Sequence, residues 1–279
     1  KERGIILSEL RDRDGANLRL ARARYAANYQ GTIIGDRLPI GIAETITAAD
    51  RPLIAAYYAA FYRPERMILV VVGAVDPVAV VAQVRTTMGA VVANGAAVAT
   101  PTLGELTLAE SPVVVTRVDP EADDTTIHLV RVMPEPRPVD GVAHRRDELV
   151  RALAEGVLAR RISALVSKDP ACPLQDGGAF SYHWVGFAHA GIQGTAKPSR
   201  ALDAVRVLVR EYRRLLEYGP TVSELAIEAK AYAAQLDTAV VQAATRTNPQ
   251  LAQMLYTAAF HGETVLSPTQ DRELFAPMV

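Results

Sequence analysis

Apolar residues recur along this chain at the three-to-four-residue spacing of helices, and elsewhere they form short uninterrupted runs. The clearest helical pattern covers Val142–Ser167, where Leu149, Leu153, Val157 and Ile162 fall on one side. Capping residues, glycine and proline mark the ends of further predicted helices elsewhere in the chain. These helices cover residues 2–29 with an interruption at Gly15, 48–61 with Thr47 as N-cap, 77–88 with Asp76 as N-cap, 200–217, 221–246 and part of 249–279.

The uninterrupted runs predict strands. Met67–Gly73 reads MILVVVG, and this run without a polar residue predicts a central strand buried on both faces. Residues 112–118 and 125–134 predict two more strands. Phe180–Thr195 alternates aromatic and polar residues between glycines, which is typical of a hairpin. Helices and strands mixed in this way predict an α+β fold, with mostly antiparallel sheets and helices packed on one face of each sheet.

The length of 279 residues suits two domains. Charge is absent between Val91 and Gly104 while Ala, Val and Gly are frequent, so we predict a linker over residues 96–110. The two predicted domains are then residues 1–95 and 111–279. Lys1 opens inside a helical pattern and the last residues show no clear stop signal, so we expect both domains to be incomplete at these ends.

Composition narrows the classes of function. Lys and Arg number 30 against 31 Asp and Glu, and no long basic run is present, which argues against a dedicated nucleic-acid binder. A single cysteine, Cys172, excludes an intrachain disulfide framework. No apolar run reaches the length of a membrane span. Hydrophobic residues make up 49% of the chain, enough for a substantial core.

Two carboxylates in the first helical pattern are candidates for chemistry. Glu2 and Glu9 are seven residues apart, nearly two helical turns, so both project from one face. We expect the apolar residues Ile5–Leu7 between them to press this helix into a core. A partly buried carboxylate needs a cation, and a metal ion is one way to supply it. The alternative is that both acids are solvated beside Arg3 and Arg11.

An acidic turn over residues 119–124 offers a second, weaker interpretation. Its carboxylates belong to Asp119, Glu121, Asp123 and Asp124. Such a turn either binds a cation or is a solvated loop, and the sequence favours the loop.

Three segments together resemble the insulinase-like, or pitrilysin-like, zinc metallopeptidases that carry an inverted zinc motif. They are ERGIILSE at residues 2–9, RLPIG at 37–41 and FYRPERMILVVVGAVDP at 61–77. In that family H-x-x-E-H supplies two histidine ligands and a general base, and a glutamate on a later helix is the third ligand. The resemblance implies that Glu9 is the zinc ligand and that Glu2 is an accessory catalytic acid. It covers residues 1–89 and extends loosely over the second half.

The family's H-x-x-E-H motif is absent from this sequence, and no two histidines stand at helical ligand spacing. His183 and His189 are six residues apart and would share a face if their strand were continuous. The five histidines are His128, His144, His183, His189 and His261. The two imidazole ligands and the base must therefore come from an upstream segment or a different polypeptide, such as a second insulinase-like domain or subunit.

The resemblance implies a portion of a zinc-dependent endopeptidase that cleaves peptides with a metal-activated water inside a closed chamber. The alternative is a non-catalytic homologue that binds peptide or a partner without chemistry. The presence of both Glu2 and Glu9 favours the enzyme, because a binding wall has no need of paired acids there. The resemblance also favours a periplasmic or secreted location, with the cytoplasm left open.

Overall fold

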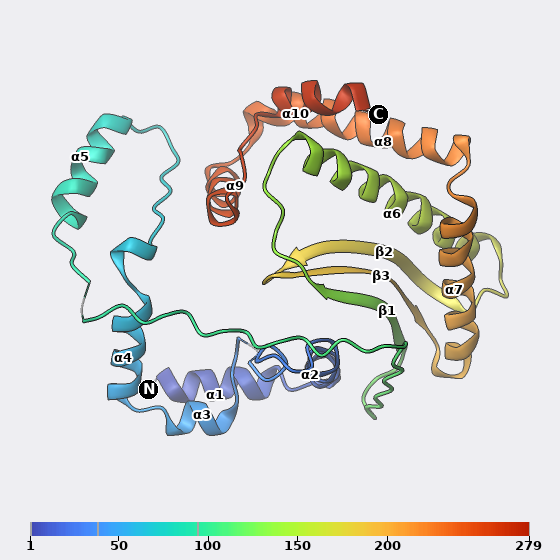
Figure 1. Ribbon diagram of the computed structural model, residues 1–279, viewed down its shortest axis with the longest axis horizontal. Helices are drawn as coiled ribbons and strands as arrows, with labels where there is room; N and C mark the ends of the chain where they lie inside the picture. Colours follow the sequence, from blue (N-terminus) through green and yellow to red (C-terminus); the bar gives the residue numbers. More distant parts are fainter. Residues whose placement is uncertain (1, 38, 94, 279) are drawn as a thin grey trace.

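The computed structural model describes residues 2–37, 39–93 and 95–278 and shows a mixture of helices and one antiparallel sheet (Figure 1). This confirms the α+β class. The ends of the predicted domains at Lys1 and Val279, and Leu38 of the RLPIG segment, lie outside the described residues. The main elements are α1 (Glu2–Asp12), α2 (Ala16–Asn28), α3 (Ala43–Ala48), α4 (Arg51–Phe61), α5 (Pro77–Met88), β1 (Thr125–Pro134), α6 (Val142–Lys168), β2 (Leu174–Trp184), β3 (Phe187–Ala196), α7 (Ala201–Tyr218), α8 (Val222–Val241), α9 (Asn248–His261) and α10 (Pro268–Phe275).

The sheet has the strand order β1-β3-β2, and both pairs are antiparallel. Successive side chains of a strand point to opposite faces, and the face that carries Ile192 of β3 packs against α6 and α7. This packing buries the main core, and α8 and α10 cover α6 from outside (Figure 1). The buried cluster consists of Ile127, Leu158, Ile162, Leu174, Ile192, Ala196, Ala204 and Leu208.

Helix α2 packs on the other face of the same sheet, so helices are not confined to one face. The ring of Tyr29 lies 5.7 Å from that of Phe187 and 5.5 Å from that of Trp184, measured between centroids. Val132 of β1 completes this second, smaller cluster. The first part of the chain is thereby joined to the sheet through aromatic side chains.

Two predicted strands are wrong for the structure. Met67–Gly73 and residues 112–118 form no strand, and their side chains are largely exposed, Val71 for example to 48%. An apolar run becomes a strand only when a neighbouring strand completes its hydrogen-bond ladder. Within the described residues no segment pairs with either run.

Helix boundaries follow capping chemistry. The helix predicted over 48–61 is α4 and begins at Arg51, because Asp50 rather than Thr47 provides its N-cap and accepts a hydrogen bond from Leu53 N at 2.9 Å. Thr47 instead lies inside a separate short helix, α3. The interruption at Gly15 is confirmed, as is the N-cap role of Asp76. The predicted hairpin is longer than expected and spans β2 and β3, and the predicted helix over 221–246 ends at Val241 in a short 3-10 turn.

The predicted linker over 96–110 is partly packed against the end of α2. Ile33 N donates to Leu103 O at 2.8 Å, and Thr107 N donates to Gln30 O at 2.8 Å. Gly31 has a φ of +87°, and a Cβ there would lie 2.3 Å from the Glu105 carbonyl, so only glycine allows this approach. The division into domains 1–95 and 111–279 stays a prediction.

No helix in the described part of the chain combines the length and apolar character that a membrane crossing requires.

Candidate functional site

Helix α1 carries both predicted site residues, Glu2 and Glu9, on an accessible surface. The helix contacts α3, and the Arg3 guanidinium donates a hydrogen bond to the Ala49 carbonyl. The expectation that Ile5–Leu7 press α1 into a core is wrong, because Ile5 is 54% exposed and only Leu10 is buried. Leu10 is the single buried residue of the helix, Leu7 is half-buried, and Ile5 and Ile6 are exposed.

Glu9 forms an ion pair with the residue that directly follows its helix. Its Oε1 atom lies 2.7 Å from Nη2 of Arg13, one turn further along, and its side chain is 48% exposed. Exposed pairs of this spacing contribute little stability, so the carboxylate can exchange this partner at low cost. Glu2 is exposed near the start of the same helix, and the seven-residue spacing places both acids on one face.

The described residues do not make up a complete zinc site. They contain no group of three His, Cys, Asp or Glu side chains placed to hold a metal ion. A catalytic zinc needs three protein ligands, and α1 offers one carboxylate of the predicted set.

The histidines of the hairpin are separated by its turn. The prediction that His183 and His189 share a face holds only for one continuous strand, and here β2 ends at Trp184 and β3 begins at Phe187. His183 pairs with Glu135 at 3.2 Å, whereas His189 is buried and its Nε2 lies 2.5 Å from Tyr29 Oη. Burial lowers the pKa of His189 below its ordinary value. The two imidazoles therefore bind different partners, His183 to Glu135 and His189 to Tyr29.

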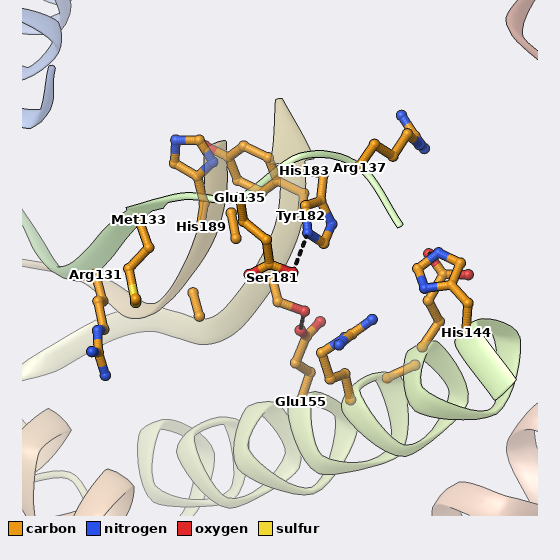
Figure 2. A pocket seen from close by; sticks show the side chains of 15 residues that line it. Arg131, Met133, Glu135, Arg137, His144, Glu155, Ser181, Tyr182, His183 and His189 are labelled. Carbon is orange, nitrogen blue, oxygen red and sulfur yellow. Dashed lines mark hydrogen bonds and ion pairs between the residues drawn. The ribbon is translucent and has the colours of Figure 1, made fainter. Parts of the chain in front are cut away.

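A polar hollow of about 450 Å³ lies between the sheet and the first half of α6 (Figure 2). Three carboxylates line it, and each has a hydroxyl or imidazole partner. Ser181 donates to Glu155, His183 lies 3.2 Å from Glu135, and His144 lies 3.2 Å from Glu148. The guanidiniums of Arg131, Arg137 and Arg151 also line the hollow.

The hollow could not be found from sequence, because its partners are far apart in the chain. Ser181 and Glu155 are separated by 26 residues, and His183 and Glu135 by 48. Ser181 and His183 hydrogen-bond to different carboxylates. The balance of acidic and basic groups makes this a polar surface of mixed charge.

The acidic turn forms ion pairs with basic side chains of the same chain. Arg19 Nε lies 2.6 Å from Asp119 Oδ2, and Arg19 Nη2 lies 2.5 Å from Glu121 Oε2. The Arg19 guanidinium lowers the pKa of Asp119 to about 2. Asp124 pairs with Lys197 at 2.7 Å. These contacts fasten the turn to α2 and to the region after β3.

Comparison with known proteins identifies the family. Residues 48–232 match the model of the peptidase M16 inactive domain, so the chain belongs to the peptidase M16 family. Over 96 residues, 34% of this chain and 10% of the relative, it is 31% identical to "Probable zinc protease PqqL" of Escherichia coli K12. These findings confirm the resemblance to zinc metallopeptidases.

Solved structures show the same fold. The periplasmic protease PqqL from Escherichia coli superposes with a TM-score of 0.80 and 22% identity, over 98% of this chain and 30% of that one. A predicted insulinase family protease from Yersinia pestis gives a TM-score of 0.68 and 20% identity, over 91% of this chain and 54% of that one. The chain thus spans less than a third of the solved PqqL chain.

Proposed function

We propose that this chain is a portion of a zinc-dependent endopeptidase, which hydrolyses peptides with a metal-activated water inside a closed chamber. Membership of the peptidase M16 family and similarity to a probable zinc protease support the reaction class. The observation that carries the proposal is the placement of Glu2 and Glu9 on one accessible face of α1. The peptide substrate and the chamber are part of the same proposal.

In this proposal Glu9 is a metal ligand and Glu2 orients a neighbouring ligand or water. Glu9 would leave its ion pair with Arg13 and offer a carboxylate oxygen, a ligand type that zinc accepts. The two imidazoles and the general base would come from polypeptide outside these 279 residues. Zinc, when bound, lowers the pKa of its water and polarises the scissile carbonyl. In this proposal the present 279 residues contribute to hydrolysis only together with that polypeptide.

Zinc content and peptide hydrolysis of the complete polypeptide test these roles. Glu9→Gln should lose zinc and activity together, because a neutral amide is a poorer ligand than a carboxylate. Glu2→Gln should keep zinc and lower the turnover number. Arg13→Gln is the matched control, because it removes the ion pair and leaves the Glu9 carboxylate. Full zinc occupancy and full hydrolysis in Glu9→Gln would contradict the proposal.

The alternative is a non-catalytic homologue that binds peptide or a partner subunit. The match to an inactive domain and the polar hollow of Figure 2 favour this function. It predicts peptide binding without zinc and without hydrolysis. Isothermal titration of the complete polypeptide with a mixed-charge peptide, with and without chelator, separates the two. Chelator-sensitive hydrolysis supports the enzyme, and chelator-insensitive binding alone supports the homologue.

We further propose a periplasmic location. The support is the similarity to PqqL, which is described as a periplasmic protease. Cell fractionation of the complete polypeptide, with a cytoplasmic marker measured beside it, tests this.

A further inference from the structure

Helix α7 carries a line of apolar side chains that the core does not bury. The helix packs against β3 and α6, and its buried residues are Ala204, Leu208 and Glu211. A second line repeats at the alternating spacing of three and four residues that lets two helices pack side by side. On this line Leu202 is 74% exposed and Leu216 is 67% exposed. The outer seam, as we call it, consists of Leu202, Val205, Val209, Tyr212 and Leu216.

Two arginines follow one flank of the outer seam. Arg206 and Arg213 are exposed and seven residues apart, so they project from the same side of α7. Each directly follows a seam residue, at the position that carries the charges selecting a partner in paired helices. The corresponding residues on the other flank, Leu208 and Leu215, pack into the core. The accessible flank of the outer seam is therefore basic.

The remaining arginines of α7 have a carboxylate inside the helix. Glu211 is buried, and the arginines at positions 210 and 214 lie 3.0 and 3.5 Å from its carboxylate oxygens. Arg206 lies 2.7 Å from Asp203, but both side chains are more than half exposed, so this pair can exchange at low cost. Arg213 has no ion pair among the described residues. Arg206 and Arg213 are therefore the two guanidiniums that a partner can reach.

This arrangement indicates the kind of partner. A second copy of α7 in antiparallel orientation would place Arg206 opposite Arg213 of that copy, and like charges oppose this contact. A flat anionic membrane would meet the exposed Glu217 together with the two arginines, and the leucines lie to one side of them. An acidic helix matches both features, because its apolar side chains cover the outer seam and its carboxylates pair with the guanidiniums.

We propose that α7 docks an amphipathic helix of another protein, which places apolar side chains on the outer seam and Asp or Glu side chains against Arg206 and Arg213. Leu202 and Leu216 are about 21 Å apart along the helix, so the contact extends over two heptads of the partner. Figure 1 shows α7 and α1 on opposite sides of the view. The docking surface needs neither Glu9 nor zinc, and it therefore goes beyond the proposed function.

Binding of two designed helical peptides to the complete polypeptide tests this surface. Both peptides span about three heptads and present leucine to the outer seam; the flanking residues are glutamate in one and lysine in the other. In fluorescence anisotropy at low salt, the glutamate peptide should bind about tenfold more tightly than the lysine peptide, and added salt should reduce the difference. Equal affinities, or the absence of saturable binding, would overturn the proposal.

A charge reversal tests the role of the arginines. Arg213→Glu should lower the affinity for the glutamate peptide by about tenfold and raise the affinity for the lysine peptide. Arg146→Glu, at an exposed position of α6, is the matched control and should change neither affinity. Only a folded surface can bind the lysine peptide more tightly, so misfolding cannot imitate the expected result. An unchanged preference in Arg213→Glu would contradict the proposal.

Two more measurements test the other occupants of this surface. Leu216→Ser should weaken the binding of both peptides and leave sedimentation with phosphatidylglycerol vesicles unchanged. Sedimentation velocity of the complete polypeptide should be the same for the parent and for Arg213→Glu. Vesicle binding that Leu216→Ser removes would assign the surface to a membrane, and self-association that Arg213→Glu alters would assign it to a second copy. Either result would overturn the docking of an acidic helix.

Discussion

The sheet region, residues 125–278, and the α3–α5 region, residues 43–93, use similar apolar residues with opposite results. In the sheet region, Ile162 and Leu208 are fully buried between the sheet and its helices. In the α3–α5 region, Leu69 is 55% exposed although it stands in one of the most apolar runs of the chain. The difference is one of partners rather than composition.

The comparison shows what an apolar run specifies. It specifies that burial is favourable, but the surface that buries it must come from another segment. The strands of the sheet region find their neighbours within 72 residues, from Thr125 to Ala196. The run at Met67–Val72 finds no strand among the described residues. Substitutions that remove apolar contacts should therefore lower the unfolding free energy by very different amounts in the two regions.

The largest expected difference is between two truncations in the 279-residue chain. Ile162→Ala should cost about 3 kcal/mol of unfolding free energy, because it leaves a cavity in a closed core. Leu69→Ala should cost about 0.5 kcal/mol or less, since its side chain already faces solvent. Urea denaturation followed by circular dichroism measures both. Equal costs would show that the α3–α5 region folds as part of the same core.

The next effect concerns the buried ion pair that joins α6 to the start of α8. Arg161 donates to both carboxylate oxygens of Glu224, at 2.7 and 2.8 Å, and its side chain is nearly buried. Arg161→Ala should cost about 2 to 3 kcal/mol, because it leaves Glu224 without its partner. Arg160→Ala is the matched control and should cost under about 1 kcal/mol, since the Arg160 side chain is half exposed.

The same pair predicts a pH dependence. The Arg161 guanidinium lowers the pKa of Glu224 to about 2, from an ordinary value of 4.5. The stabilisation is therefore complete above pH 4.5 and is lost as the pH falls towards 2. The gap in stability between the parent chain and Arg161→Ala should narrow over that range. A gap independent of pH would show that the effect comes from lost packing alone.

Local patterns predicted the sheet region better than the α3–α5 region for a physical reason. The apolar stripe of α6 and the N-terminus of α8 at Thr221 depend on residues near in sequence, so both bounds of α6 and the start of α8 were predicted within one residue. The end of α8 was predicted at residue 246, whereas the helix ends at Val241. The strand that was predicted at Met67–Gly73 is absent from the structure, because a strand needs a partner that the sequence pattern does not reveal. The contact between Arg19 and Asp119 spans 100 residues, and no local pattern encodes it.

The candidate site divides in the same way. The helical spacing of Glu2 and Glu9 was predicted and is confirmed for the helix itself, because α1 covers both residues. Their roles towards zinc stay a prediction. The polar hollow around Ser181 and His183 forms only after the sheet and α6 meet, so its charge pattern is a tertiary property.

A smaller effect is expected at the joint between α2 and the sheet. Trp184 is the single tryptophan of the chain, and its ring lies 6.5 Å from that of His189. Burial lowers the pKa of His189 below 6.5, so the unfolded chain binds a proton there first, and stability should fall as the pH drops below 6.5. We expect the unfolding free energy to decrease between pH 8 and pH 5.5, measured by Trp184 fluorescence during urea unfolding.

Two variants sharpen this prediction. His189→Gln removes the titrating group, so the part of the pH dependence due to this joint should disappear. Tyr29→Phe removes the hydroxyl group that meets His189 Nε2 at 2.5 Å and should cost about 1 kcal/mol at pH 8. An unchanged pH profile in His189→Gln would assign the effect to other groups.

The smallest effect is expected where α2 meets the acidic turn, because the side chains of Arg19 and Glu121 are partly exposed to solvent, although that of Asp119 is nearly buried. Arg19→Gln should lower the midpoint of urea unfolding by less than His189→Gln and Tyr29→Phe do. Adding 1 M salt should lower the midpoint of the parent chain by a similar amount. Arg22→Gln is the control, since the Arg22 guanidinium makes a long hydrogen bond of 3.5 Å to the Gly41 carbonyl and no ion pair with the described residues. The contribution of Asp119 should be present above pH 3.8 and fade as the pH falls towards 2, where its carboxylate takes up a proton. A large decrease in the unfolding midpoint of Arg19→Gln that 1 M salt does not change would contradict this. It would show that the acidic turn, rather than the aromatic cluster around Tyr29, holds α2 against the sheet.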